Sequence, residues 1–84
     1  MKYNVEVIVS YKKGVLDPQS AAISGAISSL GYQNIENLTI SKKFNFQISG
    51  REKKEVEEQV ESLCRKLLAN PVIENYQYII GEEK

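Results

Sequence analysis

The chain has 84 residues, with 11 basic and 11 acidic side chains, no histidine and one cysteine. A single domain of this length, spanning residues 1–84, buries only roughly 60–65% of its unfolded surface and is marginally stable alone. One cysteine excludes an internal disulfide, and without histidine or loop-spaced carboxylates we expect no metal site. Oligomerisation is therefore the expected source of extra stability.

The balanced charge argues against a nucleic-acid partner, because proteins that bind RNA or DNA usually carry a basic patch. No apolar run approaches the roughly 20 residues that a membrane helix needs. The first residues also lack the apolar run and cleavage site of a signal peptide. From these observations we expect no nucleic-acid and no membrane partner. The lone Cys64 fits a reducing compartment, so we expect a cytoplasmic protein.

The first predicted element is a half-buried strand over residues 3–11. Its apolar side chains recur at every second position, which is the period of a strand with one buried face. They are Tyr3, Val5, Val7, Val9 and Tyr11. Ile8 is the one large apolar residue on the opposite face, so it is a candidate for contact with a partner.

A helix is predicted from Pro18 to Leu30. Asp17 can accept hydrogen bonds from the first free amides, and proline at the first helical position loses no bond. Apolar residues then recur at i, i+3, i+4 and i+7, which predicts a buried stripe. They are Ile23, Ala26, Ile27 and Leu30. Ala22 and Gly25 keep part of this helix thin, so that a neighbour can approach its backbone, and Gly31 ends it.

The middle of the chain predicts one long strand, bent or bulged near Ser41–Lys43. Its apolar residues share one phase, at Leu38, Ile40, Phe44, Phe46 and Ile48. A hairpin that turns at Lys42-Lys43 stays open as an alternative, because no Asn-Gly or Asp-Gly signal decides the matter.

A second helix is predicted over residues 52–69, followed by a strand over residues 72–80. The apolar stripe of this helix consists of Val56, Val60, Leu63, Cys64, Leu67 and Leu68. Pro71 ends the helix, because proline cannot donate a backbone hydrogen bond and pushes Asn70 toward extended dihedral angles.

The order strand, helix, strand, helix, strand predicts an α+β fold. The economical packing is a small antiparallel sheet with both helices on one face, related to the ferredoxin-like group and dimeric. The other face then needs a partner. The expected partner interface consists of Ile8, Tyr76, Tyr78 and Ile80 on the sheet and of Asp17, Ala22 and Gly25 at the first helix.

The sequence predicts no catalytic residue. Asp17 is interpreted as a helix cap, since it has no histidine, cysteine or second carboxylate to act with. Cys64 lies in the apolar register of the second helix without a base, which is typical of a core cysteine. Lys42, Lys43 and Arg51 can contact a phosphorylated ligand, but such residues more often discourage pairing of a strand edge.

Three stretches of the chain resemble the PurS family, the small subunit of phosphoribosylformylglycinamidine (FGAM) synthase. They are Gly14-Val15-Leu16-Asp17-Pro18-Gln19, Leu30-Gly31-Tyr32 and the run from Leu63 to Tyr76, Leu-Cys-Arg-Lys-Leu-Leu-Ala-Asn-Pro-Val-Ile-Glu-Asn-Tyr. The resemblance covers essentially the whole chain. One departure is Ser41-Lys42, where the family often has Gly-Lys, and this weakens any claim for a glycine-dependent bend there.

The resemblance implies a non-catalytic assembly subunit in purine (IMP) biosynthesis. In the family, PurQ releases ammonia from glutamine, and PurL uses ATP and magnesium to convert formylglycinamide ribonucleotide. PurS resembles an adaptor between them: a homodimer that binds no cofactor itself. Further pairing of the dimer into a tetramer stays open. The sheet is expected to build the dimer and the first helix to dock the larger subunits. The alternative from another class is a stand-alone ferredoxin-like sensor of small molecules, with Gly14-Val15-Leu16 as its ligand loop.

Overall fold

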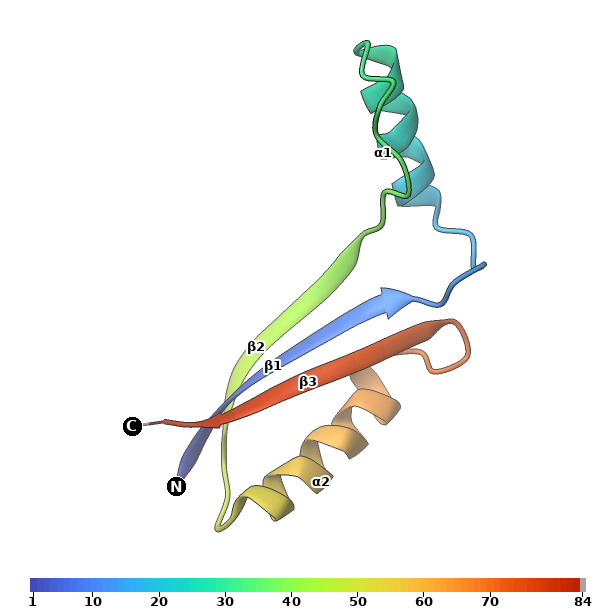
Figure 1. The fold of residues 1–84 in the computed structure, drawn as a ribbon. Helices are drawn as coiled ribbons and strands as arrows, with labels where there is room; N and C mark the ends of the chain where they lie inside the picture. The colour runs from blue at the N-terminus through green and yellow to red at the C-terminus, as the bar shows by residue number, and fades with distance from the viewer. Residues whose placement is uncertain (84) are drawn as a thin grey trace.

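The computed structural model describes residues 1–83, which form three strands and two helices (Figure 1). In chain order the elements are β1 (Lys2–Tyr11), α1 (Pro18–Ser29), β2 (Ser41–Ser49), α2 (Lys53–Leu63), the π-helical turn η1 (Cys64–Leu68) and β3 (Glu74–Glu82). The turn η1 directly prolongs α2. The predicted order of strands and helices is confirmed.

The strands form one antiparallel sheet in the order β2-β1-β3. In this register Val7 lies opposite Phe44 on one side and Tyr78 on the other. Side chains that pair across strands point to the same face, so the apolar phases of all three strands coincide. The prediction of an α+β fold with a small antiparallel sheet is therefore confirmed.

The core lies between β1 and α2. Every second side chain of β1, from Tyr3 to Val9, is fully buried, and α2 and η1 contribute Val56, Val60 and Cys64. Burial of each such side chain contributes roughly 1.5–3 kcal/mol. Gly50 allows α2 to start close to the sheet, because a Cβ there would lie 2.5 Å from a methyl carbon of Val56.

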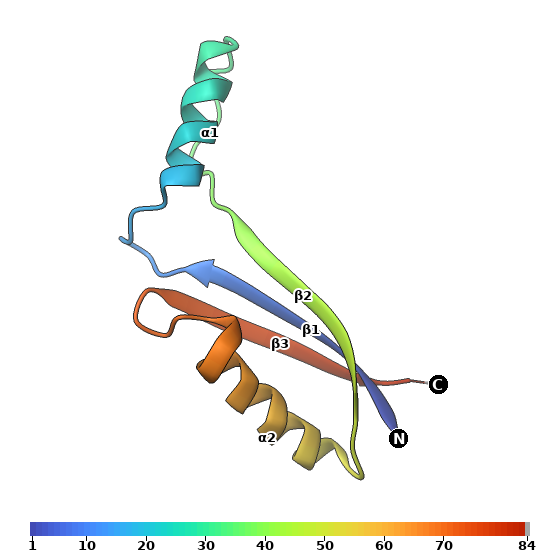
Figure 2. The same cartoon turned by 180° about the vertical axis from the view of Figure 1, so that it is seen from behind.

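The helix α2 does not cover the whole inner face of the sheet. It lies on the β3 side of the sheet (Figure 2), and its Val56 and Val60 are buried with the inner side chains of β1. The inner side chains of β2, Phe44, Phe46 and Ile48, pack against the core and are half-buried, as the inner side chains of β3 are. We call these three residues the β2 strip.

The expectation that both helices lie on one face is wrong for α1. This helix stands beyond the end of the sheet, as Figures 1 and 2 show, and none of its residues is buried. Of its predicted stripe, Ile23, Ala26 and Leu30 are exposed and Ile27 is half-buried. An apolar stripe requires a packing partner, but it does not specify whether that partner belongs to the same chain.

The middle strand is shorter than predicted and is not a hairpin. β2 begins at Ser41, and residues 33–40 return beside α1 without pairing as a strand. The reason lies in β1, which is the strand that pairs with β2 in the described part of the chain. Ser10 already pairs with Ser41, and β1 ends at Tyr11, so no strand remains opposite residues 35–40.

The junction before β3 also differs from the prediction. The π-helical turn shifts the register of the second helix, so that Leu68 is half-buried whereas Leu67 is 74% exposed. A turn then delays the strand to Glu74, whose amide donates to the carbonyl of Asn70 at 2.7 Å. At its other end β3 extends to Glu82, two residues beyond the predicted end.

Candidate interaction surfaces

The residues expected at the partner interface lie in three separate places. Tyr76 pairs with Val9 and Tyr78 with Val7, so these tyrosines point to the inner face, toward α2, and Ile80 follows them. Ile8 points to the outer face. Since successive side chains of a strand alternate between faces, Ile8 and the tyrosines cannot form one continuous sheet surface, and that part of the expectation is wrong.

The outer face of the sheet is mostly polar. Gln47 donates an amide hydrogen bond to Asn4 at 2.9 Å, and the Lys43 ammonium lies 3.2 Å from the carboxylate of Glu6. Ile8 and Ile79 are diagonal neighbours on this face, and the residues directly opposite them are Lys43, Gln77 and Glu6. Burial of this face would remove water from paired charges and amides, which makes it a poor candidate for a large apolar interface.

The tyrosines of β3 are held within the protein's own inner face. The Tyr76 hydroxyl donates to Glu61 Oε1 at 2.8 Å, and this hydrogen bond to a carboxylate raises the pKa of Tyr76. Burial raises the pKa of Tyr78. Both side chains pack against the core, so their first role is in the stability of the sheet and α2.

Asp17 caps α1, as the sequence predicts. Its carboxylate accepts from the Gln19 amide at 3.0 Å and from the Ser20 hydroxyl at 2.7 Å. The hydrogen bond from Ser20 lowers the pKa of Asp17, since it favours the charged carboxylate. Two residues of the expected interface, Ala22 and Gly25, follow on α1, and both are exposed.

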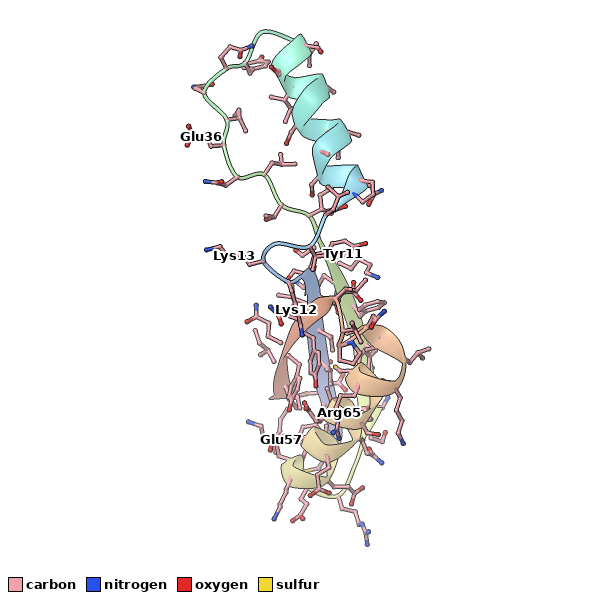
Figure 3. All side chains as sticks on the ribbon, turned by 90° about the vertical axis from the view of Figure 1, so that its right-hand side faces the viewer. Tyr11, Lys12, Lys13, Glu36, Glu57 and Arg65 are labelled. Carbon is pink, nitrogen blue, oxygen red and sulfur yellow. The ribbon has the colours of Figure 1, made fainter. Side chains whose placement is uncertain are left out.

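Residues 18–40, which comprise α1 and its return segment, form what we call the arm. In Figure 3, Tyr11, Lys12 and Lys13 lie at its junction with the sheet, and Glu36 lies on the return segment. The arm exposes large apolar side chains at Ile23, Leu30, Tyr32 and Ile35. None of these four residues is in the interface predicted from the sequence, which assigns Ile23 and Leu30 to a buried stripe. Apolar residues in the segment after Gly31 are a usable signal for such a surface.

The polar groups of the described chain do not assemble into a reacting set. Cys64 is buried, and burial raises the pKa of its thiol, which disfavours the nucleophilic thiolate. Within residues 1–83 no three potential metal ligands gather. The three basic residues considered as ligand contacts are each close to a carboxylate: Lys42 to Glu74, Lys43 to Glu6 and Arg51 to Glu55.

A hollow of about 390 Å³ lies where the sheet meets the arm. Its lining includes the predicted ligand loop, Gly14 to Leu16, together with Leu38 and Ile40. Over the described part of the chain, no helix is long and apolar enough to cross a bilayer.

The structure therefore defines a small α+β protein whose conspicuous features are uncovered surfaces rather than a reacting centre. Such surfaces are typical of a subunit that binds other proteins. The family profile of PurS, described as phosphoribosylformylglycinamidine (FGAM) synthase, matches residues 4–82. The chain belongs to the PurS family.

Individual relatives agree with this assignment. Subunit PurS of phosphoribosylformylglycinamidine synthase from Methanocaldococcus jannaschii is 40% identical over 75 residues, which cover 89% of this chain and 90% of the relative. The solved structure of MTH169, the PurS subunit of FGAM synthetase, superposes with a TM-score of 0.88 at 37% identity, covering 93% of this chain and 92% of that one.

A chain of the PurLQS structure from Thermotoga maritima has the same fold. Its TM-score is 0.85 at 24% identity, over 95% of this chain and 98% of that one. At this identity the likeness concerns the fold alone.

Proposed function

We propose that this chain, as one PurS-like domain over its whole length, is the non-catalytic PurS subunit of phosphoribosylformylglycinamidine synthase. The observation that carries the proposal is the family match over residues 4–82, together with relatives named as that subunit. The assembled enzyme is a glutamine-dependent carbon–nitrogen ligase of purine (IMP) biosynthesis, working in the cytoplasm. It transfers ammonia from glutamine to ATP-activated formylglycinamide ribonucleotide.

In this proposal the chain contributes geometry rather than a reacting group. It docks the glutaminase PurQ and the synthetase PurL, which binds ATP and magnesium. Ammonia then passes from one centre to the other without escaping to water, because accurate placement replaces a chance encounter. The ribonucleotide, the nucleotide and the metal ion all belong to the larger subunits.

The surface of the chain supports a role in assembly. Its accessible area is 6429 Å², whereas a compact monomer of 9.5 kDa exposes about 5,000 Å². The surplus of about 1,400 Å² exceeds the roughly 800 Å² that each partner buries in a standard interface. The surplus is therefore large enough for one interface of standard size.

We further propose a homodimer in which the arm of each copy covers the β2 strip of the other. A helix of 12 residues is marginal in water unless its apolar side packs against something. The β2 strip is a half-exposed apolar surface beside α2, and the chain's own α1 stands beyond the end of the sheet. The arm of a second copy covers the β2 strip, and the strip gives the apolar side of that arm's α1 a surface to pack against.

This arrangement exchanges the roles expected from the sequence. The sheet was expected to build the dimer and α1 to dock the larger subunits. The polar outer face and the tyrosines held to α2 favour the reverse, with Ala22 and Gly25 on α1 in contact with the second copy. The small side chains at these two positions allow close approach of the backbone.

Reconstitution tests the proposed function. Purified PurQ and PurL are assayed for the amidine product with glutamine, with and without this chain. We expect product formation from glutamine to require the chain, while an ammonium salt as nitrogen donor partly bypasses it. Full glutamine-dependent activity in its absence, or turnover of glutamine by the chain alone, would contradict the proposal.

The sensor alternative is not favoured, because the matches are to PurS proteins. The sensor hypothesis predicts that a small molecule binds in the hollow between the sheet and the arm, whereas the adaptor hypothesis predicts no such binding. Calorimetry of the isolated chain with amino acids and nucleotides should detect no tight binding if the chain is an adaptor.

A further inference from the structure

The outer edge of β3 carries backbone groups that no described strand satisfies. The Lys12 amide donates to the carbonyl of Ile73 at 2.8 Å, and the Glu83 amide donates to the carbonyl of Lys2 at 3.0 Å. Odd-numbered residues of β3 therefore turn their backbone groups toward β1. By alternation the even-numbered residues turn their N–H and C=O groups to the open edge. They are Tyr76, Tyr78, Ile80 and Glu82, whereas the Glu74 N–H already donates to the Asn70 carbonyl.

This edge lacks the usual protection against pairing. Residues 75–81 contain no charged side chain and no proline. Natural edge strands are commonly guarded by lysine, proline, a bulge or a covering element. The opposite edge, β2, carries Lys42 and Lys43. β3 is the other edge of the sheet, and α2 packs on its inner side chains without a described strand pairing along its outer side.

We propose that the β3 edge receives an extended segment of one of the larger subunits as a fourth strand of the sheet. This inference rests on the proposed function, and it names the surface through which the chain docks. Strand addition suits an adaptor, because the backbone hydrogen bonds provide affinity and the register fixes the orientation of the partner.

The observations favour a different protein over a second copy as the occupant. The self-pairing that overlaps the whole strand is centred on Tyr78, and it places Glu82 opposite Glu74 at both ends. The Glu74 carboxylate already lies near Lys42 and accepts from the Asn70 amide, so this pairing brings no free cation to Glu82. Like charges directly opposite each other destabilise a strand pair. In a chain already dimeric through its arms, a second self-complementary contact also propagates assembly unless the symmetry closes.

Charge indicates the chemistry of the incoming segment. Glu82 and Glu83 at the end of the edge are both exposed, whereas the carboxylate of Glu74 is occupied by the Asn70 amide at 2.7 Å. The complementary segment is uncharged along residues 76–80 and carries lysine or arginine where it meets Glu82 and Glu83.

Amide hydrogen exchange, resolved by residue, tests this inference. In the isolated chain the amides of Gln77 and Ile79 bond to β1 and exchange slowly, whereas those of Tyr76, Tyr78 and Ile80 exchange fast. When purified PurL and PurQ are added, we expect the three fast amides to slow at least about tenfold while the other two change little. Light scattering on the same samples reports whether a complex forms.

Each other outcome overturns the inference in a distinct way. Slow exchange of Tyr76, Tyr78 and Ile80 in the isolated chain means that a second copy occupies the edge. A complex that forms while these amides stay fast means that docking uses another surface, and the proposed function survives. If no complex forms, the proposed function fails and the inference fails with it.

A pair of variants gives a second measurement. Tyr78→Pro removes the edge-facing N–H, while Tyr78→Ala removes the same side chain and keeps the N–H. We expect the proline variant to bind the larger subunits about tenfold more weakly than the alanine variant, since one edge bond is lost and its neighbours are disturbed. Slow exchange at Gln77 verifies folding in both, and equal binding of the two contradicts strand addition.

Discussion

At the scale of single residues, the pair of Tyr76 and Glu61 connects the sheet to α2. The phenol donates to the carboxylate at 2.8 Å, and the pKa of Tyr76 is raised chiefly by this bond. A raised pKa in the folded state means that folding favours the protonated phenol. Its contribution to stability is complete below the ordinary value of about 10, and it is lost as the pH rises through the raised pKa.

Tyr76→Phe should therefore make the protein less sensitive to alkali. The variant loses a hydrogen bond and is less stable near neutral pH, but its free energy of unfolding should fall less between about pH 9 and pH 11 than that of the parent. Urea unfolding at a series of pH values measures both effects. Parallel curves for Tyr76→Phe and the parent would show that the pair does not govern the alkaline limb.

At the scale of secondary-structure elements, the π-helical turn η1 decides which leucine enters the core. A regular helix would carry both Leu67 and Leu68 on the apolar stripe predicted for residues 52–69. The turn rotates the end of the helix, so that Leu68 packs against the core and Leu67 is left in water. Such turns occur frequently at functional sites.

Alanine substitutions test this register. Leu68→Ala should cost about 1–3 kcal/mol of unfolding free energy, because it removes packed methyl groups from a half-buried site. Leu67→Ala should change it by less than about 0.5 kcal/mol, as is usual for an exposed position. Denaturant titration of both variants under identical conditions gives the comparison. Equal losses for the two would mean that the helix continues in regular α-helical register.

At the scale of the whole molecule, the shape is far from that of a compact chain. The radius of gyration is 16.7 Å, whereas a compact chain of this length has about 12 Å. The arm accounts for this extension, since it projects beyond the sheet along the long dimension of 53 Å (Figures 1 and 3). A projecting apolar arm and a half-covered sheet are best explained together, by a second copy.

Charge placed on the arm should separate the copies. Ile23→Lys with Leu30→Lys keeps residues that form helices well but removes the apolar contact surface. We expect this double variant to be monomeric by light scattering and to lose the rise of melting temperature with protein concentration that a dimer shows. Ile79→Lys, on the polar outer face where the native side chain is 63% exposed, is the matched control and should stay dimeric. A double variant that remains dimeric would remove the arm from the interface.

Some predictions from the sequence rest on local physics, and these hold in the structure. The cap at Asp17, the alternation in β1 and the burial of Val56, Val60 and Cys64 depend on neighbours a few positions away. The length of the middle strand is not decided by neighbouring residues in this way. It depends on where β1 ends, and the sequence of residues 35–40 does not indicate the end of a strand that lies far away in the chain.

The sequence by itself determined the elements, the apolar face of each strand, the absence of a base beside Cys64 and the resemblance to PurS. These follow from periodicity, side-chain chemistry and motif spelling, which are properties of neighbouring residues. Only the tertiary structure decided that α1 stands off the sheet, that Ile8 and the tyrosines of β3 face opposite ways, and that the β3 edge is open. Each of these depends on which surface another part of the chain covers. An apolar stripe indicates that a helix packs against a neighbour. Which surface that neighbour is depends on the packing of the whole chain.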